Sequence, residues 1–285
     1  MKPISKRTRE LKKLYEQDDF EQFAERKFTA SKTEERLAKL IHPIMPVTAN
    51  ALWPHMTEKE VVIKGHKALV EELGKIKAEK KRPLSVISIG AGDLTHEMWL
   101  KKEFPGIHIE ARDKYGLMRA RGRWELRKMG AKKARIKLER GDFANPNATK
   151  NTILPRHFDL VYSLDALHWE AQYADPAEKP LAIERTKKAL KKMTDLVKFG
   201  GKGAKLLITY RPAYKTYLED KAPYVLDPDE IKKMLIENGL GVKGKSLEPY
   251  FIERDKIKEK LKNGEKILKR RQYPSKYYLF VVEAA

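Results

Sequence analysis

From Leu84 onward, short apolar runs alternate with longer segments in which apolar residues recur every three or four positions. Short runs with β-branched residues predict strands, and a period near that of the α-helix predicts helices. Strands are expected near 85–90, 107–112, 135–140, 158–163, 204–210, 242–247 and 276–283. Helices are expected near 94–103, 115–129, 179–198 and 228–238, whereas the charged stretch 254–271 stays unassigned. This alternation is typical of a doubly wound α/β sheet.

The start of the chain follows a different pattern. Apolar residues recur there at roughly helical spacing, at Leu11, Tyr15, Phe20, Phe23 and Phe28. Prolines at positions 43, 46 and 54 interrupt the pattern, and Thr57 with Glu60 forms a candidate capping box that opens a helix to about Lys80. We therefore expect a helical N-terminal region over 1–60 and a main domain over 61–285.

The order of elements between Leu84 and Asp113 is the most informative local pattern. An apolar run ends at Gly90-Ala91-Gly92, a helical segment follows, and a second apolar run ends at Asp113. Glycines let a backbone approach a ligand, a helix N-terminus offers free N–H groups, and a carboxylate accepts hydrogen bonds from ribose hydroxyls. The pattern predicts an adenosine-type cofactor and therefore an enzyme.

Four segments follow one another along the chain: the loop VISIGAGDLT, Asp113 at 23 residues beyond Gly90, the segment Gly141-Asp142-Phe143, and FDLVYSLDALHW over 158–169. In this order they resemble those of the class I S-adenosylmethionine-dependent methyltransferases. The resemblance implies a seven-stranded, mostly parallel, Rossmann-like sheet that ends with an inserted antiparallel strand, and S-adenosylmethionine as the methyl donor. It also implies cofactor contacts from Ser88, Gly90, Gly92, Asp113, Asp142, Phe143 and Ser163.

Two positions depart from the family's pattern. Ser88 stands where the family often has an acid, and Leu94 stands where it often has a third glycine. A serine hydroxyl can donate or accept a hydrogen bond, but it does not attract a cation as a carboxylate does. Leucine also restricts the backbone more than glycine. Altered cofactor affinity, or a member that has lost catalysis, therefore stays open.

Several of these residues also have a purely structural interpretation. Asp113 could cap the next helix, and Glu110, 20 residues after Gly90, is a second candidate for the ribose. Asp142 could serve a turn, and Phe143 could belong to the core.

The segment SLDALHW is where we expect the chemistry, because it follows a buried strand at the sheet edge that binds ligands in open α/β folds. Asp165 or His168 is expected to orient an acceptor or take its proton. The structural alternative is that Asp165 caps a turn and His168 packs with Trp169 against the domain. Methyl transfer depends mainly on an in-line approach, so a dedicated base is optional.

The charge of the chain favours a polyanionic partner. The net charge is +21 over 285 residues, and basic residues outnumber acids by twelve to three over 112–140 and by ten to three over 254–276. Arg119, Arg123 and Arg127 share a helix face, as a surface that contacts RNA phosphates would. The alternative is a solvated helix face in a lysine-rich protein.

Other functional classes are disfavoured. No stretch is long and apolar enough for a membrane span, and the charged N-terminus lacks the apolar core of a secretory signal, which indicates a cytoplasmic protein. The chain has no cysteine, and its seven histidines lack ligand spacing, so no metal is expected. The oligomeric state is not predicted.

We therefore expect an S-adenosylmethionine-dependent methyltransferase whose acceptor is RNA. A small-molecule methyltransferase and a non-catalytic RNA-binding factor on the same fold are the alternatives. A nicotinamide-dependent oxidoreductase would use the same strand-turn-helix, but its G-x-G-x-x-G motif needs glycine where Thr95 stands.

Overall fold

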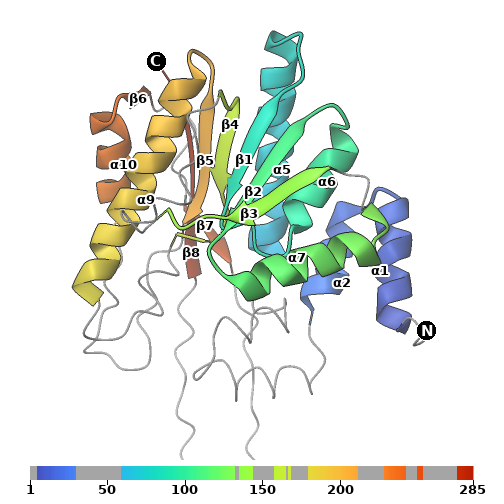
Figure 1. Ribbon diagram of the computed structural model, residues 1–285. Helices are drawn as coiled ribbons and strands as arrows, with labels where there is room; N and C mark the ends of the chain where they lie inside the picture. The colour runs from blue at the N-terminus through green and yellow to red at the C-terminus, as the bar shows by residue number, and fades with distance from the viewer. Residues whose placement is uncertain are drawn as a thin grey trace, which may run out of the picture.

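A central sheet of eight strands organises the computed structural model (Figure 1), which describes residues 5–29, 59–131, 135–143, 157–164, 166–167, 179–210, 228–241, 249–252 and 275–284. The strands are β1 (Ser85–Ile89), β2 (His108–Asp113), β3 (Ile136–Arg140), β4 (Leu160–Ser163), β5 (Lys205–Tyr210), β6 (Leu240–Gly241), β7 (Pro249–Ile252) and β8 (Ser275–Ala284). Their spatial order is β3-β2-β1-β4-β5-β8-β6, and β7 pairs with β8 off this path. The first five are parallel, whereas β8 runs antiparallel to β5, β6 and β7.

The predicted doubly wound, mostly parallel sheet with seven strands along its path is confirmed, and β7 is an addition that the sequence did not reveal. Six of the predicted strands lie within two residues of β1, β2, β3, β4, β5 and β8. The prediction over 242–247 lies outside the described residues, and β6 ends just before it. The stretch 254–271 also lies outside them.

Helices cover both faces of the sheet (Figure 1). They are α5 (Lys59–Glu79), α6 (Thr95–Glu103), α7 (Gly116–Lys128), α9 (Lys179–Gly200) and α10 (Pro228–Glu237), close to the predicted ranges. Alternation along β1 produces the two cores, because neighbouring strand residues face opposite sides. Ile87 and Ile89 join a cluster with α9 and α10. Val86 joins a second cluster with Leu69 and Leu73 of α5.

The first 29 residues contribute α1 (Lys6–Glu16) and α2 (Phe20–Phe28). Asp18 lies between them in a left-handed conformation, and the side chain of Asp19 caps the N-terminus of α2. Their apolar residues form a third core around Trp99 of α6, whose ring meets the rings of Tyr15, Phe20 and Phe23 nearly edge-on, with centroids 5.1–5.3 Å apart. The predicted helical stripe thus packs on the main domain. The boundary at residue 60 stays a prediction.

Within the part of the chain that the structure describes, every helix is too short or too polar to cross a bilayer.

Candidate functional site

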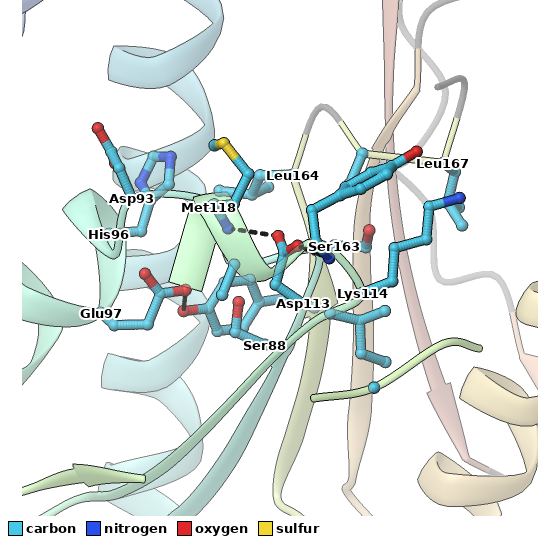
Figure 2. Close-up of a pocket in the computed structure, with 18 of the residues that line it drawn as sticks. Ser88, Asp93, His96, Glu97, Asp113, Lys114, Met118, Ser163, Leu164 and Leu167 are labelled. Carbon is cyan, nitrogen blue, oxygen red and sulfur yellow. Dashed lines mark hydrogen bonds between the residues drawn. The ribbon is translucent and has the colours of Figure 1, made fainter. Parts of the chain in front are cut away.

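A cavity of about 200 Å³ lies at the carboxyl ends of β1, β2, β3 and β4. In parallel α/β sheets this edge carries the ligand sites, because the loops that leave the strands meet there. The cavity is lined by all seven residues that the resemblance assigns to the cofactor, namely Ser88, Gly90, Gly92, Asp113, Asp142, Phe143 and Ser163. Figure 2 shows Ser88, Asp113 and Ser163 around it. The structure brings these residues together, and their binding of a cofactor stays a prediction.

The loop after β1 fits closely against its neighbours. Gly90 has a φ of +73°, and a Cβ atom on it would lie 2.4 Å from the Cβ of Ala166. Only glycine meets both demands without strain. Gly92 also has a positive φ, and its N–H points to the carboxylate of Asp113 at 3.0 Å. The two glycines therefore shape a bare backbone wall for the cavity.

Leu94 adopts a backbone conformation that favours glycine. Its φ is 63° and ψ 23°, in the left-handed region, directly before α6. This conformation costs a non-glycine residue about 1–2 kcal/mol. The side chain is 1% exposed and occupies the space that a Cβ on Gly122 would need, 2.8 Å away. Burial of the leucine offsets the backbone strain.

Asp113 ends β2, with its carboxylate 5% exposed. Oδ2 accepts from the backbone N–H of Gly92, and Oδ1 accepts from that of Tyr115 at 2.8 Å. The second bond partly realises the structural alternative, since Tyr115 is the N-cap of α7. Burial raises the pKa of Asp113, although these N–H donors oppose the shift. Each oxygen keeps a second lone pair, so the carboxylate can still accept ribose hydroxyls.

Glu110, the rival for the ribose, lies elsewhere. It is buried in the middle of β2 and pairs with the Arg112 guanidinium, and it is absent from the cavity lining.

The other predicted cofactor contacts differ in character. Phe143 belongs to the core beside α9 and also lines the cavity, and its contact with the adenine stays a prediction. Asp142 is half-buried next to it. Ser163 is fully buried, and its hydroxyl has no hydrogen-bond partner among the described residues. An orphaned hydroxyl at a cavity wall is free to bond a ligand.

The two predicted catalytic residues, Asp165 and His168, lie outside the described residues. Their neighbours Ala166 and Leu167 line the cavity.

The first turn of α6 contributes polar groups that the sequence analysis missed. Asp93, Thr95, His96 and Glu97 all line the cavity. Burial is the main reason that the pKa of His96 falls to about 3, so its imidazole is neutral. Its Nδ1 lies 3.4 Å from Nδ1 of His66, which in turn contacts Glu103 at 2.9 Å. The available sequence signal was the run of polar residues Asp93, Thr95, His96 and Glu97 directly after the glycine loop.

A lysine from the N-terminal region reaches this loop. Lys27 of α2 is 2% exposed, and its Nζ lies 2.8 Å from Asp93 and 2.6 Å from the hydroxyl of Thr95. Glu125 of α7 lies 3.7 Å away. Burial alone would raise the pKa of Asp93, but the Lys27 ammonium holds it at about 2. The ion pair ties α2 to the cavity wall.

Strand direction decides between the fold families considered above. In dinucleotide-binding sheets of the order 3-2-1-4-5-6 the strands are parallel, whereas here antiparallel β8 lies between β5 and β6. The inserted antiparallel strand is the feature that the resemblance to class I methyltransferases implies. The fold is that of a class I methyltransferase.

Comparisons with known proteins give low similarity throughout. Neither a protein-family model nor a curated relative matches the chain. Magnesium protoporphyrin IX methyltransferase from Synechocystis PCC 6803 with bound SAM has 14% identity and a TM-score of 0.49 over 90% of this chain and 99% of that one. Precorrin-6y C5,15-methyltransferase from Geobacter metallireducens has 13% identity and a TM-score of 0.44 over 77% of this chain and 86% of that one. The [4+2]-cyclase SpnF has 12% identity and a TM-score of 0.44 over 64% of this chain and 60% of that one. The strand order therefore identifies the methyltransferase fold here.

Within the described ranges, no group of three or more His, Asp or Glu side chains is arranged to hold a metal ion.

Proposed function

We propose that this protein is an S-adenosylmethionine-dependent methyltransferase that acts on a small molecule. The convergence of seven residues, from four sequence segments between Ser88 and Ser163, on one cavity of a methyltransferase fold carries this proposal. Each segment carries residues that the resemblance assigns to the cofactor. Residues that bind one ligand must line the same cavity, and these seven residues do.

The residues present fit the cofactor. The bare backbone at Gly90 and Gly92 allows close approach, Asp113 retains lone pairs for the ribose, and Phe143 offers a ring face to the adenine. The orphaned hydroxyl of Ser163 gains a partner when a polar ligand enters. When bound, S-adenosylmethionine supplies an electrophilic methyl group, and the chain's own residues bind and orient the two reactants.

The cover of the cavity favours a small acceptor. Phe28 of α2 and Val61 and Val62 of α5 line it together with the strand ends. Apolar side chains at the wall suit a compact molecule that becomes largely enclosed. A base of RNA would have to leave its strand to enter the same space, at a cost of a few kcal/mol.

The composition of the basic stretch 112–140 favours an RNA acceptor, but its contacts in the structure weaken that argument. Many of its cations are used within the fold. Arg112 pairs with Glu110 and Glu139, Arg121 and Lys128 lie near Glu125, Lys137 pairs with Glu139, and Arg119 donates to the Asp113 carbonyl. The exposed Arg123 and Arg127 keep RNA as a second candidate, since neither takes part in these internal pairs, whereas the exposed Trp124 ring already contacts the cations of Arg121 and Lys128. The basic stretch beyond Arg254 lies outside the described residues up to position 274.

Thermal-shift and calorimetric titrations test the cofactor. S-adenosylhomocysteine should stabilise the protein, by about 2.7 kcal/mol at one hundred times its Kd. Asp113→Asn should weaken this binding by about 10- to 100-fold, because a charged acceptor for the ribose is lost. Asp195→Asn is the matched control, since Asp195 forms an exposed pair with Lys191 on α9. Stabilisation by a nicotinamide dinucleotide but not by S-adenosylhomocysteine would overturn the proposal.

Transfer of labelled methyl groups separates the acceptors. We expect label in a fraction of small metabolites and none in total RNA. Filter binding to RNA at increasing salt is the companion measurement, because phosphate contacts weaken steeply with ionic strength. Salt-sensitive RNA binding together with label in RNA would favour the second candidate.

A further inference from the structure

Glu97 places a carboxyl group at the cavity with an incomplete set of hydrogen bonds. It lies in the first turn of α6, its side chain is 1% exposed, and it lines the cavity (Figure 2). Its Oε1 accepts a hydrogen bond from the Tyr162 hydroxyl at 2.7 Å. Its Oε2 is buried and has no partner among the described residues. A buried carboxyl oxygen without a donor destabilises the protein unless something else satisfies it.

Among the described residues, the charged and titratable groups around Glu97 provide no hydrogen-bond donor to its Oε2. Burial raises the pKa of Glu97 to about 7, the hydroxyls of Ser88 and Tyr162 oppose that shift, and Asp93 adds to it. The Lys27 ammonium from α2 is already bound to Asp93 and Thr95. Burial lowers the pKa values of His96 and of His66 on α5, so both rings are neutral. In the part of the chain that the structure describes no cation pairs with Glu97, so a ligand that carries one would complete the carboxyl group's hydrogen bonds.

We propose that Glu97 binds the ammonium group at the amino-acid end of the cofactor. This rests on the proposed function, in which the cofactor is S-adenosylmethionine. An ammonium group carries three N–H donors, which is what Oε2 lacks, whereas the sulfonium centre carries none. The hydrogen bond then forms between two opposite charges in a buried place, where such bonds are strongest.

The position of Glu97 suits this role. In Figure 2, His96 and Glu97 lie at one side of the cavity and Lys114 and Leu167 at the other, with Asp113 between them. A ligand that holds its ribose at Asp113 therefore extends with one end toward Glu97. The start of α6 lies at this same end, and although the Thr95 N–H already donates to Asp93, the positive end of the helix dipole favours the ligand's carboxylate there.

Glu97 also explains how the cavity tolerates Ser88. Ser88 occupies the strand position at which a carboxylate was expected, and its side chain interacts with Glu97. The carboxyl group comes from the helix that follows the loop instead of from the strand that precedes it. The cavity therefore has a carboxyl group beside Ser88, but this group belongs to α6 and not to β1.

Calorimetry on the wild type and Glu97→Gln tests the inference with two ligands, S-adenosylhomocysteine and 5′-methylthioadenosine, which lacks the amino-acid end. Glu97→Gln should weaken S-adenosylhomocysteine by about 10- to 100-fold and change 5′-methylthioadenosine less than about 2-fold, because one charge-assisted hydrogen bond is lost. Glu71→Gln, in an exposed pair with Lys75 on α5 and outside the cavity lining, should leave both affinities unchanged. The glutamine keeps the size of the side chain, and thermal unfolding at pH 8 checks that the variant folds.

Proton release gives a second readout. Because burial raises the pKa of Glu97 to about 7, binding of the ligand's ammonium group near pH 7 should release a fraction of a proton, and Glu97→Gln should remove this release. Equal weakening of both ligands, or unchanged affinity for S-adenosylhomocysteine, would overturn the role of Glu97. Failure of the wild type to bind either ligand would instead overturn the proposed function.

Discussion

The buried ion pair between Lys27 and Asp93 predicts that the N-terminal helices are structurally coupled to the cofactor loop. Lys27→Met preserves the length of the side chain but removes its charge. Asp93 then loses its 2.8 Å partner, and Glu125 loses a cation at 3.7 Å. Removal of one partner from a buried pair costs about 3–5 kcal/mol, because the remaining charge stays buried and uncompensated.

A surface pair provides the matched control. Lys67 of α5 lies 2.5 Å from Glu21 of α2, so it joins the same helix to the main domain, but both side chains are more than half exposed. Exposed pairs contribute about 0–1 kcal/mol, so Lys67→Met should have little effect. Lys27→Met with Asp93→Asn should recover part of the loss, since the uncompensated carboxylate is then neutral.

Urea unfolding followed by circular dichroism measures these free energies, provided that the transition is two-state. The depressed pKa of Asp93, about 2, means that its contribution is present above the ordinary carboxyl pKa and is lost as the pH falls toward 2. The variants should therefore be compared near pH 7. If Lys27→Met costs no more than Lys67→Met, the coupling argument is wrong.

Two further predictions concern the cavity wall. Because the folded-state pKa of Glu97 is raised from 4.5 to about 7, its favourable contribution is present below pH 4.5 and is lost as the pH rises through 7. Ligand-free wild type should lose about 3 kcal/mol over this range relative to Glu97→Gln, as measured by urea titrations at several pH values; parallel curves would contradict the shift. Gly90→Ala should abolish binding of S-adenosylhomocysteine through its clash with Ala166, whereas Gly74→Ala, at a helical position in open space, should stabilise the protein by about 1 kcal/mol. Ala166→Gly should partly restore binding to Gly90→Ala in the same titration, and unimpaired binding by Gly90→Ala alone would count against the close fit.

Periodicity predicted most of the fold because the long helices and buried strands bury one face or both. β1, β4 and β5 read as apolar runs because both of their faces are covered. β7 was missed because it has only four residues and depends on pairing with β8, which lies far along the chain. Such pairing leaves no local signal.

The candidate site shows the same division. Ser88, Gly90, Gly92 and Asp113 stand at fixed places relative to strand ends, so sequence spacing located them. Lys27 was not recognised, because a lysine in an amphipathic helix normally faces water. Its partner Thr95 is 68 residues away, and only the packing of α2 on α6 creates the contact. The buried state of Glu97 likewise follows from tertiary packing.

The antiparallel strand β8 has a consequence for folding. During synthesis β5 is complete 65 residues before β8 begins, and until then its outer edge carries unpaired backbone groups. That edge belongs to a strand in which all residues after Lys205 are buried in the native protein. A nascent chain at this stage presents an apolar open edge of the kind that recruits other chains. Substitutions that weaken β8 should therefore reveal themselves first as aggregation during expression, before any loss of cofactor binding is seen in the protein that folds.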